Sequence, residues 1–312
     1  KQSDVQTIQN FDPTTSVPLS SMTDFSNTNG TFAPEVSRSM WAIYLNNLYD
    51  ITSNSRITFG TRYDHYSDFG SNLSARGGLA YLLDDKTTLK LMYGEGFRAP
   101  TFAELHNKSN VISGDATLSP EKVKTYEISI DSNITNSLDY KLTVFRNDFT
   151  DLIVLDGQKY VNRGATKTKG IELESKYKLH RGSYFKFNYT FQNATDESSN
   201  EELPNIAKHK GNIFFNYRVS KNVNWFNHLY IKGKVKRSSS DSRDSLDSYI
   251  VFNTSVIFKN IFKNMQLKTS INNLFDKQYY DSSTYKSTAQ NKEIDDYLNN
   301  GRTFFVEVKY TF

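Results

Sequence analysis

The acidic side chains that could act in pairs lie where turns are expected. Asp84-Asp85 and Asp295-Asp296 are two pairs of adjacent acids, in a tight turn and in a long polar segment. Aspartate is common at such places because its side chain hydrogen-bonds its own backbone. The chain has no cysteine, which excludes a thiol nucleophile and a Cys-based metal site. No Ser, His and Asp grouping has supporting context either, so the sequence predicts no enzyme and no bound cofactor.

The stretch LMYGEGFRAPTFAELH, residues 91–106, carries the most distinctive residue types. The guanidinium of Arg98 is a rigid fork of donors that suits a carboxylate or a backbone carbonyl. Pro100 has no N–H for a strand ladder and is expected at a strand end. Gly94 and Gly96 permit a positive φ and a close approach of the backbone. These residues predict a strand that breaks into a marked turn, which Arg98 ties in place.

Composition leaves two classes open for the elements that position this turn. The chain has 312 residues, 22 Phe, 20 Tyr and a net charge of +4, and this balance does not indicate a nucleic-acid partner. No run of 18 or more apolar residues and no N-terminal signal pattern occur. A soluble all-β protein fits these features. A transmembrane β-barrel fits them equally, because every second residue of its strands faces water.

Alternation of apolar and polar residues recurs from residue 38 to the end and predicts strands. The last segment is the clearest, with one face made of Phe304, Val306, Val308, Tyr310 and Phe312. About thirteen such segments start near residues 38, 55, 71, 86, 123, 138, 166, 184, 209, 223, 247, 265 and 302. Several run roughly ten to fifteen residues, longer than ordinary globular strands and long enough to cross a bilayer when tilted.

The predicted connections alternate between short and long. The short ones are Ser53-Asn54, Asp84-Asp85, Asn133 to Ser137, Arg181-Gly182, Lys221-Asn222 and Asn260 to Asn264. The long ones are 94–122, 147–165, 192–208, 236–246 and 279–301, with a smaller one near 64–70. Short turns at one end and long loops at the other are typical of outer-membrane barrels. The pattern therefore predicts a bacterial outer-membrane barrel with Phe312 at the short-turn, periplasmic end.

Five phrases then follow one another in a familiar order. They are YGEGFRAPTFAEL, GDATLSPEKVKTYEI, TKGIELE, INNLFDKQYY and the terminal GRTFFVEVKYTF. This series resembles the TonB-dependent outer-membrane receptors, which import ferric siderophores, haem or cobalamin. The resemblance covers residues 38–312. It implies an all-β fold: an antiparallel transmembrane β-barrel with about 13–14 strands present, as the C-terminal part of a 22-stranded barrel whose plug domain is absent from the chain.

The resemblance also assigns roles. Residues 1–37 would be the end of an upstream strand and an extracellular loop, and 38–312 the C-terminal barrel portion. The residues implied to form the motif and anchor the loop are Phe97, Arg98, Ala99, Pro100, Glu104, Leu118, Pro120 and Glu121. Phe312, at the end of an apolar face, resembles the signal that the barrel-assembly machinery recognises.

The resemblance leaves the ligand open between three iron or cobalt chelates. Haem receptors of the family have a haem-ligating His between a FRAP box and an Asn-Pro-Asn-Leu box. Here His106 follows FRAP, but the second box reads Asp115-Ala116-Thr117-Leu118. A ferric siderophore is therefore favoured, with haem or cobalamin as alternatives, and no metal is expected unless His106 binds haem iron.

A basic group at the end of one predicted strand gives further ligand candidates. Its members are Lys232, Lys234, Lys236, Arg237 and Arg243. They form either an ordinary solvated face or a positive patch that attracts anionic siderophores or lipopolysaccharide phosphates. Loop tyrosines could stack on a planar ligand. The ligand-binding candidates are thus His106, Arg237, Arg243, Tyr285 and Tyr297.

The predicted function is uptake of a scarce ferric siderophore by TonB-coupled transport. TonB would act through an N-terminal plug that this sequence lacks. Outer-membrane lipid and lipopolysaccharide would be further partners, and no nucleic acid is expected. The alternative from another class is a passive porin or adhesin, whose loops bind a partner without energy coupling.

Overall fold

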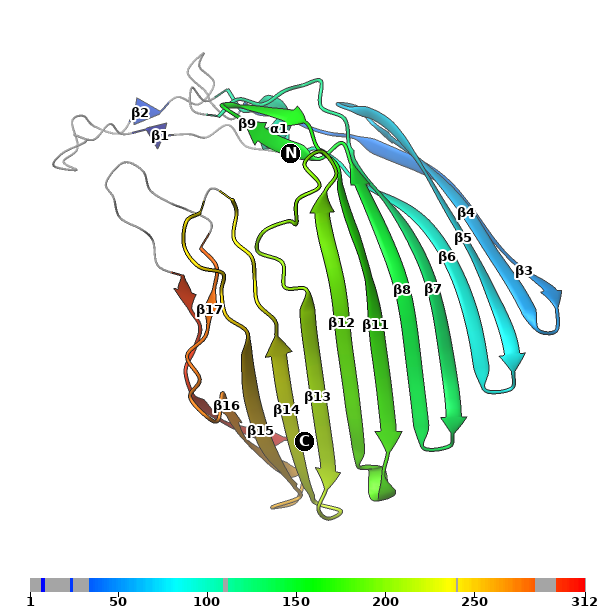
Figure 1. The fold of residues 1–312 in the computed structure, drawn as a ribbon, viewed down its shortest axis with the longest axis vertical. Helices are drawn as coiled ribbons and strands as arrows, with labels where there is room; N and C mark the ends of the chain where they lie inside the picture. Colours follow the sequence, from blue (N-terminus) through cyan, green and yellow to red (C-terminus); the bar gives the residue numbers. More distant parts are fainter. Residues whose placement is uncertain are drawn as a thin grey trace.

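One curved antiparallel sheet makes up most of the molecule (Figure 1). The computed structural model describes residues 34–108, 112–239, 241–283 and 296–311, together with the two-residue strands β1 (Thr7–Ile8) and β2 (Thr23–Asp24). The sheet has thirteen strands, and each pairs with its neighbour along the chain, from β3 at one edge to β19 at the other. Its thirteen strands confirm the number expected from the alternation.

The strands begin within three residues of the positions predicted from the sequence. They are β3 (Met40–Thr52), β4 (Ser55–Tyr66), β5 (Gly70–Asp84), β6 (Thr87–Arg98), β7 (Glu121–Thr135), β8 (Leu138–Thr150), β11 (Thr166–Lys178), β12 (Tyr184–Asp196), β13 (His209–Arg218), β14 (Val223–Lys232), β15 (Tyr249–Lys259), β16 (Met265–Asn272) and β19 (Thr303–Tyr310). Three two-stranded pairs stand outside the sheet: β1 with β2, β9 (Ile153–Asp156) with β10 (Lys159–Asn162), and β17 (Tyr280–Asp281) with β18 (Tyr297–Leu298).

The register places like residues side by side on each face of the sheet. Ile171 lies opposite Val144 on one side and Phe191 on the other. Glu174, on the other face, lies opposite Lys141 and Asn188. The sheet therefore has one apolar face and one polar face. Large side chains of the apolar face are broadly exposed, and an apolar surface of this width suits lipid rather than water.

The connections are sorted by length between the two ends of the strands, as predicted (Figure 1). The short-turn end carries the turns 53–54, 85–86, 136–137, 179–183, 219–222 and 260–264. The other end carries 67–69 and the loops 99–120, 151–165, 197–208, 233–248 and 273–302. Several tight turns contain residues with a left-handed backbone conformation. Arg181, Asn260 and Asn264 have φ between 53° and 62°.

One local prediction was wrong. Strand β6 does not break at its glycines but continues to Arg98, and neither Gly94 nor Gly96 has a positive φ. Gly96 instead allows a close approach, because a Cβ there would lie 3.2 Å from Cγ1 of Val123. A short helix, α1 (Phe102–His106), follows the strand, although almost no helix was expected. No helix among the described residues is long and apolar enough to cross a membrane.

The sorting of the loops generates a topological prediction. An epitope tag inserted at Ser198, in a long loop, should be reached by antibody on intact cells, because long loops of such barrels face outward. The same tag at Lys221, in a short turn, should be reached only after the outer membrane is opened. Surface labelling at Lys221 would contradict the assigned orientation, and tag detection in lysed cells is the control for expression.

Candidate functional site

Arg98 joins both ends of the loop that follows β6. Its Nε lies 2.6 Å from Oε2 of Glu121, the first residue of β7. Its two terminal nitrogens lie 3.0 Å from the two carboxylate oxygens of Glu104 on α1. A forked, charged pair of this kind is strong and directional. The contacts support the predicted role of Arg98 as an anchor of the loop 99–120.

A capping box fixes the helix that presents Glu104. The backbone N–H of Thr101 donates to the Glu104 carboxylate at 2.7 Å, and the Glu104 N–H donates to the Thr101 hydroxyl at 3.2 Å. Burial acts to raise the pKa of Glu104, but hydrogen bonds from Arg98 and Thr101 outweigh it and lower the pKa. The Thr-x-x-Glu spacing is a known helix-start signal, so the sequence did contain evidence for α1.

Arg38 also holds the start of the loop 99–120, and the sequence analysis did not predict this role. Its Nη2 donates to the carbonyl of Pro100 at 2.7 Å, and its Nε lies 2.8 Å from Asp68 in the β4–β5 turn. The guanidinium also covers the rings of Phe69 and Phe102, at 4.9 and 5.0 Å from their centroids. Nothing local in the sequence connects Arg38 to Pro100, because 62 residues separate them.

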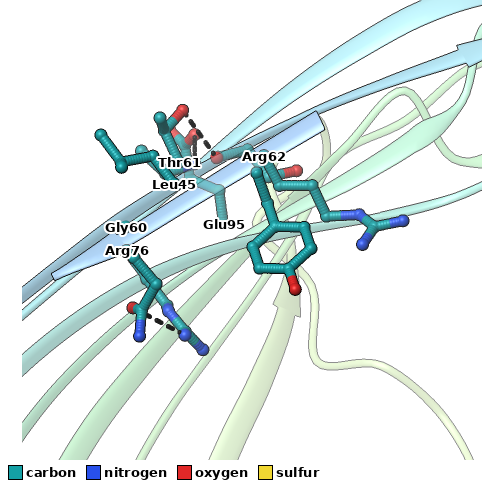
Figure 2. Close-up of a pocket in the computed structure, with 10 residues that line it drawn as sticks. Leu45, Gly60, Thr61, Arg62, Arg76 and Glu95 are labelled. Carbon is teal, nitrogen blue, oxygen red and sulfur yellow. Dashed lines mark hydrogen bonds between the residues drawn. The ribbon is translucent and has the colours of Figure 1, made fainter. Parts of the chain in front are cut away.

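Strands β5 and β6 separate before they reach the loops that Arg38 and Arg98 hold. The β5–β6 ladder ends at the pair Arg76 and Gly94, although both strands continue. A cavity of about 320 Å³ lies there, lined from both faces of the sheet (Figure 2). Glu95 enters it and accepts a hydrogen bond from the N–H of Ala75 at 3.0 Å, which replaces a ladder bond. Arg76 donates to Asn46 at 2.8 Å across Gly60, the contact drawn dashed beside Arg76 in Figure 2.

The second motif, residues 115–118, attaches the same loop to the β9–β10 hairpin. Asp115 lies 2.8 Å from Nζ of Lys159, and this ion pair, with hydrogen bonds from Thr117, lowers the pKa of Asp115 to about 2. Leu118 is buried. His106, which ends α1, is only half-buried. Residues 115–118 thus connect the loop to the β9–β10 hairpin. The role of His106 as a haem ligand stays a prediction.

The two arginine candidates are held inside the protein by acids of loops 233–248 and 273–302. Arg237 is 8% exposed, and its Nη1 lies 2.8 Å from Oδ1 of Asp296. Arg243 lies 2.6 Å from Asp241, whose pKa it lowers. The cluster joins loop 233–248 to loop 273–302, so most of the charge of these arginines is balanced internally. Their direct contact with a ligand stays a prediction.

The remaining candidates are less constrained. Tyr297, in β18, is exposed. Tyr285 and Phe312 lie outside the described residues. Among the described residues, no group of three or more acidic or histidine side chains could hold a metal ion.

Three lysines that were not among the predicted ligand-binding candidates line a cavity of about 360 Å³ at the long-loop end. They are Lys208, Lys234 and Lys236. Lys208 pairs with Glu202, and Lys234 lies 3.7 Å from Asp247, although both partners in this second pair are highly exposed. Within the described part of the chain, no ion pair is formed by Lys236. The cavity therefore has an excess of positive charge.

The backbone around this lysine cavity is well supported. Val235 forms isolated bridges with Ala207 and with Leu246, and the N–H of Asn205 donates to the carbonyl of Lys236 at 2.8 Å. Ala207 and Val235 are both buried. The strand β14 ends at Lys232, so Lys234 and Lys236 lie beyond the strand and not on it as predicted. Their positions are set by these loop contacts.

Comparisons with known proteins agree with the fold. Residues 2–274 match a family model described as "TonB dependent receptor-like, beta-barrel". The chain is 25% identical over 272 residues to an iron-regulated outer membrane virulence protein of Vibrio cholerae, covering 78% of this chain and 42% of that protein. It is 27% identical over 268 residues to a vitamin B12 transporter of Photobacterium profundum, covering 82% of this chain and 42% of that protein.

Solved structures share the same architecture. A mutant of the ferric enterobactin receptor of Pseudomonas aeruginosa aligns with a TM-score of 0.76 and 18% identity, over 99% of this chain and 48% of that chain. The siderophore receptor PirA of Acinetobacter baumannii aligns with a TM-score of 0.75 and 19% identity, over 91% of this chain and 48% of that chain. The chain thus spans less than half the length of these relatives.

The Arg98 anchor makes a specific prediction. Replacing Arg98 with Ala leaves Glu104 and Glu121 without their shared partner, so the loop 99–120 should be cut faster by protease added to isolated outer membranes. We expect a stability loss of about 1 kcal/mol, because the pair is partly exposed. Arg98→Lys should be intermediate, since it keeps the charge but not the fork.

Arg163→Ala is the matched control for this experiment, because it removes an exposed pair with Asp156 in the neighbouring hairpin. It should leave cleavage within 99–120 unchanged. Wild-type protection of the loop in Arg98→Ala would show that the anchor is not needed.

Proposed function

The chain belongs to the TonB-dependent receptor β-barrel family, and on this premise we propose that it forms wall and loops of a receptor that takes up a ferric siderophore. The family is one of non-enzymatic outer-membrane transporters. Uptake by this receptor would be driven by TonB, acting through a plug supplied by a further part of the protein. The relatives it matches are more than twice as long as the matched region, which supports such a division.

The observation that carries the choice of ligand is the lysine cavity. Ferric siderophores of several chemistries are anions, and a cavity with unbalanced ammonium groups attracts them and raises their local concentration. Lys236 has the least compensated charge of the three lysines, and Lys234 has only a distant, exposed partner. The cavity also lies at the long-loop end, where a ligand would arrive from outside.

The open edges of the sheet support the larger assembly. Strands β3 and β19 each pair on one side only among the described residues. In lipid, an unpaired strand edge leaves backbone groups without partners, at a cost of several kcal/mol per group. Further strands that pair with both edges would close the barrel, and a closed barrel of this family has a lumen in which a plug can sit.

Haem and vitamin B12 remain the alternative ligands within the family. Proteins described as a heme/hemopexin utilization protein of Haemophilus influenzae and as vitamin B12 transporters match the chain at similar identity. His106 is the feature that would favour haem. A passive porin or adhesin role has no comparable support, because the matched family couples transport to TonB.

The lysine cavity can be tested with a charged probe. In the intact receptor, the double variant Lys234→Gln, Lys236→Gln should bind gallium tris-catecholate, a trianion, about tenfold more weakly, equivalent to about 1.4 kcal/mol. The loss should shrink at high salt, because salt screens exposed charges. Binding is measured by competition in purified outer membranes.

The control variant is Lys259→Gln, Lys263→Gln, which removes two lysines at the short-turn end. It should bind the probe as the wild type does. A neutral ferric trihydroxamate should distinguish charge from shape, since its binding should be insensitive to both double variants. Equal binding of the trianion by all three proteins would reject the cavity as the site.

His106 separates the siderophore from the haem alternative. We expect His106→Ala to leave binding of the catecholate probe unchanged, because the histidine lies on α1 and does not line the lysine cavity. We also expect no shift of the haem Soret band when haem is added to the wild-type receptor. A Soret shift that is lost in His106→Ala would reverse the preference and assign haem.

A further inference from the structure

The short-turn end of the sheet, which faces the periplasm in the assigned orientation, is unevenly charged along its rim (Figure 1). No Asp or Glu occurs in strands β13 to β16 or in the two short turns that connect them in pairs. The short turn between β11 and β12 lacks acids as well. We call the cations of these three consecutive turns and of the adjoining strand ends the basic rim: Arg181, Arg218, Lys221, Lys259 and Lys263.

The charge of the basic rim is not balanced by the flanking strands. The acids that β8, β11 and β19 carry near this end already face other lysines. These pairs are Asp139 with Lys178, Glu174 with Lys186, and Glu307 with Lys268. No cation of the basic rim forms an ion pair with a described residue, and all of them are exposed. The basic rim therefore carries uncompensated positive charge.

Three of these cations, Arg218, Lys221 and Lys259, line one cavity of about 290 Å³ around the β13–β14 turn. Nη2 of Arg218 lies 3.4 Å from the carbonyl oxygen of Lys221, and the N–H of Lys259 donates to the carbonyl of Asn222 at 2.7 Å. These contacts hold the guanidinium and the end of β15 beside the turn. The only apolar side chain in the lining is Val223, and no aromatic ring is present there. The cavity therefore suits carboxylates and offers a planar chelate no ring to stack on.

The strand residues of the basic rim face away from lipid. Tyr217 and Phe258 are exposed on the apolar face of the sheet. The next residues, Arg218 and Lys259, lie on the polar face, because successive side chains of a strand point to opposite faces. A lipid headgroup is therefore not the fitting ligand, and the anion must come from water.

The spacing of the turns indicates the size of the ligand. Neighbouring short turns are two strands apart, and strands are spaced by about 4.8 Å, so the basic rim extends roughly 20 Å from Arg181 to Lys263. One small anion cannot contact cations that are this far apart. An extended polypeptide covers about 3.3 Å per residue, so a segment of about six residues spans the basic rim.

The other half of the short-turn end is not basic. The β5–β6 turn carries Asp84 and Asp85 beside Lys86. Next to the β3–β4 turn, Arg56 pairs with Asp50 at 2.5 Å. Positive charge is thus confined to the half formed by β11 to β16, and this polarity would fix where an acidic partner docks.

We propose that the basic rim is the docking site for an extended acidic segment of a separate periplasmic protein, with carboxylates received in the cavity around Arg218. The guanidinium fork of Arg218 suits one carboxylate, and the lysines act as point charges for others. Lys221 and Lys263 lie in the turns themselves, beyond the strand ends, so they are reached from the periplasm and not only from inside the barrel. The proposal does not depend on which ligand the receptor takes up.

The test uses the intact receptor purified from outer membranes, with hexaglutamate as the probe and hexaglutamine as its uncharged match. The wild type should bind hexaglutamate in preference to hexaglutamine. Arg218→Gln, Lys221→Gln should bind hexaglutamate roughly fivefold more weakly, because exposed charge pairs are individually modest, and the difference should shrink at high salt. The control is Lys122→Gln, Lys124→Gln, which makes the same charge change at the long-loop end of β7 and should bind as the wild type does.

Two measurements on the wild type make the outcome independent of how well the variants fold. Hexaglutamate with a photoreactive end group should cross-link to the turns 179–183, 219–222 and 260–264. Free glutamate that supplies the same concentration of carboxylate should not displace the peptide. Cross-links confined to the long loops, equal binding of the two peptides, or unchanged binding by a folded Arg218→Gln, Lys221→Gln variant would overturn the proposal. Displacement by free glutamate would reject the extended segment as the ligand.

Discussion

The structure depends on the pairing of strand backbones. In hydrocarbon there is no water to satisfy a free N–H or C=O, so each strand must pair along its length with both neighbours. The eleven inner strands of the sheet obey this rule through simple sequential pairing, and the edge strands β3 and β19 pair on one side among the described residues. Where the β5–β6 ladder stops, the side chain of Glu95 takes over and accepts the N–H of Ala75. Arg38 then connects the segments beyond the gap through Pro100 and Asp68. The FRAP motif is best understood as part of this repair.

Ion pairs hold the long loops together, as backbone hydrogen bonds hold the strands together. Arg98 connects α1 to the start of β7, and Arg237 connects two loops through Asp296. These guanidiniums are used for architecture, which explains how receptors with different ligands could share such residues. Lys234 has only a distant, exposed partner and Lys236 forms no ion pair with a described residue, so these two lysines are better suited to meet a ligand. Loop anchoring and ligand attraction are thereby divided between Arg and Lys.

The two faces of the sheet explain how one wall serves two environments. The polar face suits a water-filled or protein-filled lumen, and the apolar face suits acyl chains. The next residue along a strand faces the other environment, since successive side chains point to opposite faces of the sheet. A functional change on one face can therefore leave the other face intact.

The sequence alone determined the strands, their order, the sorting of the turns and the family resemblance. These depend on period-two alternation and on turn residues such as Asn260 and Asn264, which are local properties. Even the missed helix had a local signal in Thr101 and Glu104. The tertiary structure alone decided which charges are free. Arg237 meets an acid 59 residues away, and Lys169 meets Arg146 across a ladder. Neither pairing is visible locally, because the register between strands sets which charges become neighbours.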